Sequence, residues 1–145
     1  MIFKTIKGVI VSNNKIIQTE GGDVLHGIKK SDNGFESFGE AYISEINPAI
    51  VKGWKRHKIM VLNFVVPIGK IKFLLFDDRK KSKTQGSYQE IILSKNNYCR
   101  ITIPAMIWVA FENIGDEKAI LLNIASIPHD PNEVEIKNLT EIEYK

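Results

Sequence analysis

Cysteine and long apolar runs are both scarce in this sequence. Cys99 is the only cysteine, so no internal disulfide can form, and this is typical of a reducing compartment. No run approaches the roughly 18 apolar residues of a membrane span, and residues 1–5 lack the apolar core of a signal peptide. We therefore expect a cytoplasmic protein with no membrane contact.

An excess of charge of one sign is also missing. The chain has 20 Lys and Arg against 17 Asp and Glu, which leaves a net charge of +3. The basic residues are scattered rather than gathered along one element, so nucleic-acid binding is not indicated. The one dense charged run, residues 77–86, is expected to be a solvated surface loop.

Metal ligands and phosphate-binding loops are equally sparse. A stable metal site needs three or four His, Cys or carboxylate ligands. The chain has three histidines, His26, His57 and His129, and Lys55 stands where a second histidine would complete a His-x-His pair with His57. No glycine-rich phosphate loop and no signature of a Ser-His-Asp or Cys-His triad is present. We expect neither a metal nor a cofactor.

Helical periodicity is absent, whereas short apolar runs recur between turn residues. Such runs occupy residues 8–11, 15–17, 23–28, 38–46, 50–68, 70–76, 88–93, 98–103, 107–111 and 119–124. About ten strands at this spacing indicate an all-β sandwich or barrel. A chain of 145 residues is expected to form one domain, residues 1–145, with a barrel over about 15–127 and the last residues on its outside.

The run at residues 50–68 contains the pattern that is most informative about function. Lys55 and His57 are two residues apart, so on a strand their side chains point to the same face. A barrel of this size can hold one small ligand. Three amides, Asn63, Asn113 and Asn123, interrupt or end apolar runs, and each serves either a structural hydrogen bond or a ligand.

The two tryptophans also have two possible roles. Trp54 and Trp108 could stack on a base or a sugar ring, but packing between the sheets is the more common role of such residues. We therefore expect both to be core residues.

An ordered set of short motifs resembles one enzyme family. The segments are residues 39–44, 51–54, 69–70, 77–79, 103–105 and 127–133. Their order and spacing resemble the dTDP-4-dehydrorhamnose 3,5-epimerases and their shorter relatives, over roughly residues 15–140. The resemblance implies a dimeric, metal-free, cupin-like jelly roll that binds a nucleotide-linked 4-keto sugar for surface-polysaccharide synthesis. It also implies proton transfer at the carbons next to the keto group.

The sequence departs from this family at the site itself. The family's Arg-Gly-Leu-His pattern reads Lys52-Gly53-Trp54-Lys55, so Lys55 takes the position of the base and Lys52 that of the phosphate-facing arginine. The tyrosine that acts as acid falls at Asn123. The carboxylate that would orient the base has no evident counterpart.

These patterns lead to two hypotheses. In the first, the protein is a sugar-nucleotide epimerase or isomerase in which Lys55, desolvated beside His57, acts with it in proton transfer, or His57 alone is the base. Lys52, Asn63, Arg79, Asn113 and Asn123 would then bind the substrate, and Lys52, Lys55, His57, Asn63 and Asn123 would face one cavity. In the second, a catalytically degenerate barrel binds a nucleotide sugar or a partner protein. Apolar strands within residues 1–17 would expose sheet edges on a monomer, so a homodimer is expected.

Overall fold

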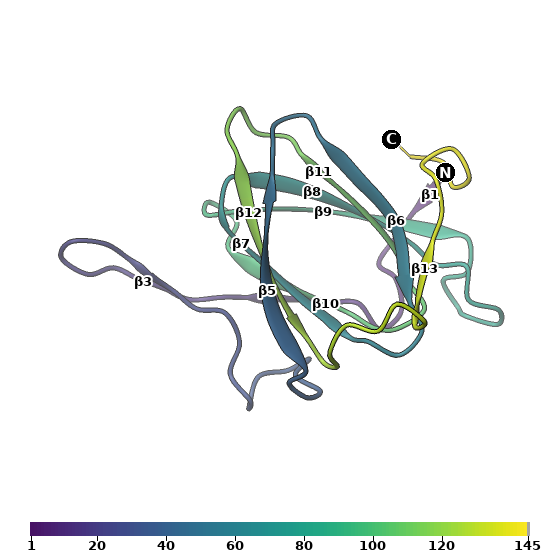
Figure 1. The fold of residues 1–145 in the computed structure, drawn as a ribbon, viewed down its shortest axis with the longest axis horizontal. Coiled ribbons are helices and arrows are strands. Elements are labelled where there is room, and N and C mark those ends of the chain that lie inside the picture. Colours follow the sequence, from purple (N-terminus) through teal and green to yellow (C-terminus); the bar gives the residue numbers. More distant parts are fainter. Residues whose placement is uncertain (145) are drawn as a thin grey trace.

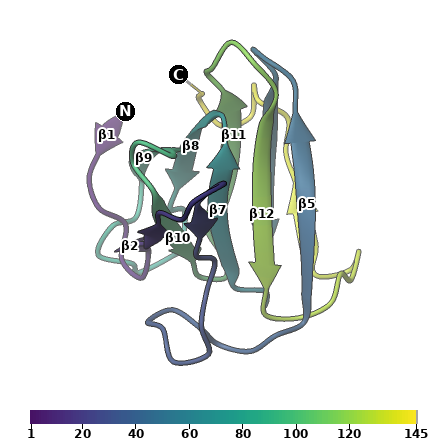
Figure 2. The same ribbon diagram turned by 90° about the vertical axis from the view of Figure 1, so that its left-hand side faces the viewer.

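The strands form two facing sheets and one small hairpin. The computed structural model describes residues 1–144, which contain no helix. The six-stranded sheet has the order β1 (Ile2–Phe3), β9 (Ser87–Ser94), β8 (Lys70–Phe76), β11 (Trp108–Asn113), β6 (Val51–His57) and β13 (Val134–Ile136). The five-stranded sheet has the order β2 (Ile10–Asn13), β10 (Cys99–Ile103), β7 (Leu62–Ile68), β12 (Ala119–Ala125) and β5 (Glu40–Ile46). Figure 2 looks onto this second sheet.

This architecture is a cupin-like jelly roll, so the predicted all-β class is confirmed. The predicted limits of the barrel were too narrow, because β2 and β13 lie outside residues 15–127 and still belong to the two sheets. The run at 15–17 and part of that at 23–28 instead pair as the hairpin of β3 (Ile16–Ile17) and β4 (Val24–Leu25). Figure 1 shows the β3 segment extending away from the two sheets.

Alternate residues of the strands fill the space between the sheets. Phe64 on β7 stacks on Phe73 on β8, with ring centroids 5.4 Å apart, and Ile101 on β10 is fully buried in the same cluster. Side chains on every second residue of a strand point to the same face, so the inward side chains of these strands together form one apolar layer between the sheets. Gly69 makes the turn between β7 and β8 at φ +86°, where an added Cβ would lie 2.6 Å from the Cβ of Ala119.

The C-terminal residues cover the outer face of the six-stranded sheet, as predicted. Trp54 and Trp108 lie on this outer face and are 0% and 1% exposed, in a cluster that includes Ile142. Nε1 of Trp54 donates to the carbonyl of Ile142 at 3.1 Å. The prediction that the tryptophans pack between the sheets was therefore wrong, because the C-terminal segment buries an outer face that a bare sheet would expose.

Candidate functional site

A cavity of about 370 Å³ lies between the two sheets, next to the aromatic core, from which Phe64 and Phe111 line it. Its walls come from β6 and β11 of one sheet and from β5, β7 and β12 of the other. The lining residues are Tyr42, Ser44, Val51, Lys52, Gly53, Lys55, His57, Leu62, Phe64, Val109, Phe111, Leu121 and Asn123. Mostly apolar walls with a few polar groups are typical of a small-molecule site.

A bulge in β6 places both Lys52 and Lys55 on the cavity wall. Strand alternation alone would send these two residues to opposite faces. The pairing with β11 shifts between them, since Lys55 lies opposite Val109 and Lys52 opposite Phe111, so β6 has one residue more than its partner. Gly53 fits there because its φ is +152° and an added Cβ would lie 2.5 Å from that of Ala110. Lys52, Lys55 and His57 consequently face the same cavity.

His57 is paired with a buried carboxylate. Its Nδ1 bonds to Oε1 of Glu133, a residue that is 4% exposed. The backbone N–H groups of Ile59 and Met60 donate to Oε2 of Glu133 at 3.1 and 3.2 Å. Burial alone would raise the pKa of Glu133, but the hydrogen bonds from His57 and from these two N–H groups outweigh it and lower that pKa. An ionised carboxylate on Nδ1 leaves Nε2 as the free ring nitrogen and stabilises the ring when it accepts a proton.

A tyrosine and an amide form a second polar pair in the cavity. Nδ2 of Asn123 on β12 donates to the hydroxyl oxygen of Tyr42 on β5 at 2.9 Å. Asn123 is 1% exposed and Tyr42 is 44% exposed, so the pair reaches from the interior to the opening. The hydroxyl oxygen of Tyr42 accepts this bond, and its own hydrogen therefore remains available to a ligand.

Both lysines of the site are exposed, although Lys55 was expected to be desolvated. Both Lys52 and Lys55 line the cavity but are solvent-exposed. The expected desolvation of Lys55 is therefore wrong, since a residue that is exposed keeps its charged end in contact with water. His57, held by Glu133, is the better placed base of the two.

Two of the three predicted amides do not face the cavity. The Nδ2 of Asn63 donates to the carbonyl of Gly34, and its Oδ1 accepts from Arg100 Nε and Thr102 Oγ1. Asn63 alternates along β7 with Leu62 and Phe64, which do line the cavity, so it points to the opposite face. There the loop around Gly34 buries it, which is why its sequence context looked like that of a core position.

Asn113 is also fully occupied by structural bonds. Its Nδ2 donates to the carbonyls of Ile46 and Glu117, both at 2.8 Å, and its Oδ1 accepts from the N–H of Gly115 at 2.9 Å. It lies at the end of β11 and closes the turn before β12. Its proposed contact with substrate is therefore withdrawn.

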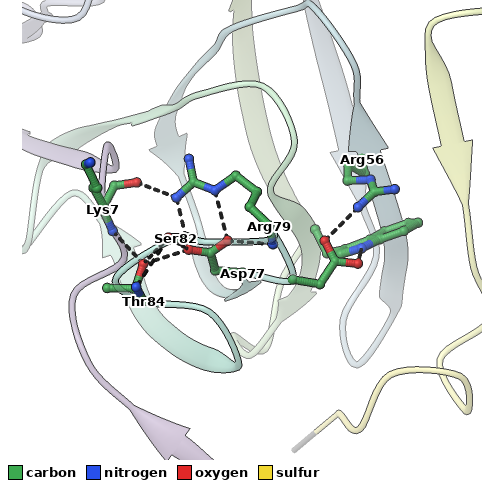
Figure 3. A network of polar contacts seen from close by, with 8 residues as sticks. Lys7, Arg56, Asp77, Arg79, Ser82 and Thr84 are labelled. Atoms are coloured by element: carbon green, nitrogen blue, oxygen red, sulfur yellow. Dashed lines mark hydrogen bonds and ion pairs between the residues drawn. The ribbon is translucent and has the colours of Figure 1, made fainter.

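Arg79 belongs to a separate polar network. Its Nε donates to Asp77 Oδ1 at 2.8 Å, and a terminal nitrogen donates to the carbonyl of Lys7 at 2.7 Å. Figure 3 shows Asp77 also reached by Ser82 and Thr84, and the three side chains surround a carboxylate that is 0% exposed. Arg79 is thus not a substrate contact. Asp77 likewise corrects the prediction that residues 77–86 are simply solvated, because this network ties that loop to the N-terminal segment.

Sequence reasoning missed Glu133 and Tyr42. Glu133 lies 76 residues after His57, and only its place in the motif 127–133 hinted at a role. Tyr42 lies on β5, in the motif 39–44, and reaches Asn123 across the pairing of β5 with β12. The family's tyrosine is replaced at this position by Asn123, and the hydroxyl that lies beside this amide comes from Tyr42 on the neighbouring strand.

Within residues 1–144 no group of three or more His, Cys, Asp and Glu side chains is arranged to hold a metal ion. The same residues contain no helix long and apolar enough to cross a membrane.

The fold and much of the sequence match known sugar-nucleotide enzymes. A dTDP-4-dehydrorhamnose 3,5-epimerase from Sulfolobus tokodaii has a TM-score of 0.83 and 21% identity, over 95% of this chain and 81% of that chain, which shows a shared fold. A dTDP-sugar isomerase from Desulfovibrio desulfuricans G20 is 39% identical with a TM-score of 0.90, over 92% of this chain and 85% of that chain. This chain belongs to the family of dTDP-sugar isomerases that are related in fold to the dTDP-4-dehydrorhamnose 3,5-epimerases. The resemblance in the motifs is thereby confirmed.

A curated relative is a probable low-salt glycan biosynthesis epimerase of Haloferax volcanii, 35% identical over 91 residues. The match covers 62% of this chain and 58% of that relative's length. No family model matches the chain.

Proposed function

We propose that this protein is a nucleotide-sugar epimerase or isomerase that acts on a dTDP-linked 4-keto-6-deoxyhexose in surface-glycan biosynthesis. The observation that carries the proposal is the pairing of His57 with buried Glu133 at the wall of the cavity. A histidine oriented by a carboxylate is an arrangement suited to a general base. The names of the relatives, a dTDP-sugar isomerase and a glycan biosynthesis epimerase, support the substrate class.

The proposed chemistry begins with proton removal next to the ketone. Nε2 of His57 takes the proton, the C–H electron pair moves onto the keto oxygen as an enolate, and Glu133 stabilises the imidazolium. The free hydroxyl hydrogen of Tyr42 bonds to the enolate oxygen. Lys55 returns a proton from its ammonium to the carbon, and proton exchange between the imidazolium and the lysine amine through water restores both groups. His57 and Lys55 therefore work as a pair, and Lys52 at the opening attracts the diphosphate as a point charge.

Solvent-deuterium exchange tests this proposal. The parent protein is incubated with dTDP-4-keto-6-deoxyglucose in deuterated water, and NMR locates deuterium at C3, C5 or both, or a ketone moved to C3. We expect His57→Asn and Lys55→Ala each to slow exchange by roughly 10²–10⁴-fold. The double variant should be little slower than either, because residues that act as a unit are non-additive. His129→Asn is the matched control, since His129 is exposed and lies outside the cavity.

Two results would contradict the proposal. Undiminished exchange in the double variant would place the chemistry elsewhere. No exchange in a parent protein that still binds dTDP would support the binding barrel, in which the altered site keeps the nucleotide but performs no proton transfer.

We further propose a homodimer of single-domain chains in the cytoplasm. β2 and β5 are the edge strands of the five-stranded sheet, and Val11 and Ile43 on them are 47% and 66% exposed. Ile17 and Val24 on the projecting hairpin are about half exposed. A second copy would cover these edges and apolar groups. Light scattering at micromolar concentration should give twice the chain mass of 16.5 kDa, and a monomer there would contradict the assembly.

A further inference from the structure

Asn123 differs from the other buried amides because half of its carboxamide has no partner. Its Nδ2 donates to Tyr42, whereas its Oδ1 is the only buried side-chain nitrogen or oxygen of residues 1–144 without a hydrogen bond. Asn63 and Asn113 each make three hydrogen bonds through the same group. A buried polar atom left unpaired is costly, and such atoms are rare.

The residue that carries this unpaired oxygen lies on the wall of the cavity. Asn123 is 1% exposed and lines the cavity from β12. In the structure the bond to Tyr42 engages the amide nitrogen and leaves the oxygen for another group. The unpaired atom is an acceptor, so only a donor can satisfy it.

The chemistry of a sugar nucleotide narrows the choice of donor. A keto oxygen and the diphosphate oxygens are acceptors and cannot pair with Oδ1, whereas a sugar hydroxyl can donate to it. Tyr42 offers the opposite polarity, since its oxygen is engaged and its hydrogen is free. The hydrogen-bonded pair thus presents a donor beside an acceptor, which complements a carbonyl oxygen beside a hydroxyl.

We propose that Asn123 determines specificity by accepting a hydrogen bond from the hydroxyl next to the ketone, so that the site selects α-hydroxy ketones. This inference rests on the proposed function and specifies its substrate: a 4-keto sugar that carries a C3 hydroxyl. Tyr42 receives the keto oxygen and Asn123 Oδ1 receives the C3 hydroxyl. A 3-deoxy sugar leaves the amide oxygen unpaired and binds poorly.

The experiment compares two substrates in several proteins. Deuterium wash-in next to the ketone is measured with dTDP-4-keto-6-deoxyglucose and with its 3-deoxy analogue, and kcat/KM is expressed as the ratio between them. We expect the ratio of kcat/KM for the hydroxylated sugar to kcat/KM for the 3-deoxy sugar to be roughly 10–100-fold larger in the parent than in Asn123→Leu. The intrinsic difference in C–H acidity between the sugars cancels in this comparison. Ser44→Ala removes another polar group from the wall and should keep the parent ratio.

The variants also separate a specificity role from a structural one. Tyr42→Phe should slow both substrates and weaken the preference for the hydroxyl, because the amide of Asn123 then loses the bond that engages its nitrogen. Equal ratios in the parent and in Asn123→Leu would overturn the inference even if the parent is an active enzyme. If the parent exchanges neither sugar, the proposed proton transfer fails, and the same ratio taken from dissociation constants by calorimetry then decides whether Asn123 reads the hydroxyl.

Discussion

Replacing Glu133 by glutamine should remove the base without removing the histidine. The carboxylate accepts from His57 through one oxygen and from the N–H groups of Ile59 and Met60 through the other. The side-chain amide of glutamine has only one oxygen, so either His57 or the two backbone N–H groups must face its NH₂ group. If the NH₂ group faces the backbone, it opposes two N–H donors, at a cost of about 2–4 kcal/mol for the unpaired groups.

The cheaper orientation turns the glutamine NH₂ group towards His57. Nδ1 must then accept a hydrogen bond, so the ring proton moves to Nε2, the nitrogen that would take the substrate proton. The ring stays in place in the wrong tautomer. We expect a fall in kcat of roughly 10²–10⁴-fold with a loss of about 1–3 kcal/mol in unfolding free energy, because a charge-assisted hydrogen bond becomes a neutral one.

The pH dependence of stability supplies a second measurement. The folded protein holds the pKa of Glu133 below its ordinary value. The carboxylate therefore stabilises the fold above the ordinary carboxyl pKa, near 4.3, and this contribution is lost as the pH falls through the lowered one. Urea unfolding should show parent and Glu133→Gln differing by a constant amount at pH 6–7 and converging in acid.

Glu135→Gln is the matched control for this substitution. Glu135 is two residues away and pairs with Arg56 at 2.6 Å, away from the cavity. Its variant should exchange deuterium at nearly the parent rate. The reasoning is refuted if folded Glu133→Gln stays within about threefold of the parent, or if both glutamine variants lose activity equally.

Two further substitutions test the surroundings of the site. Asp77→Asn should lower the free energy of unfolding by about 2–4 kcal/mol at pH 7. Burial would raise the pKa of Asp77, but its bonds to Arg79, Thr84 and Ser82 hold that pKa well below its ordinary value, so the folded protein depends on the charged form. The loss should shrink as acid protonates the parent carboxylate, and a urea midpoint unchanged at pH 7 would contradict this. Gly53→Ala should lower the free energy of unfolding by about 2–4 kcal/mol and slow deuterium exchange, since its Cβ would lie 2.5 Å from that of Ala110. Gly21→Ala, at φ +88° with no atom within 4 Å, should lose only about 1 kcal/mol in thermal unfolding and keep its activity.

The sequence predicted strands better than it predicted which face each side chain takes. Turn residues and β-branched runs marked the elements, and the spacing of Lys55 and His57 correctly placed both on one face. Asn63 was assigned to the wrong face because loop and core bury both sides of β7, so an isolated polar residue there does not reveal its direction.

Contacts between distant segments were beyond local patterns. Glu133 reaches His57 from the segment before β13. The loop of Asp77 reads as solvated surface, yet Arg79 ties it to the carbonyl of Lys7 in the N-terminal segment. Lys55 is the reverse case, since its place on the cavity wall was predictable from spacing, whereas its exposure depends on where the wall ends.

The divided faces of β6 have an evolutionary consequence. Trp54 faces outward and is held by the C-terminal segment, whereas Lys52, Lys55 and His57 face the cavity. Mutations of the outward residues are filtered by selection for a stable fold, and mutations of the inward residues by selection for chemistry. An arginine can therefore replace Lys52, or a histidine Lys55, without disturbing the strand that carries them, so that the chemistry of the cavity can change while the fold is kept.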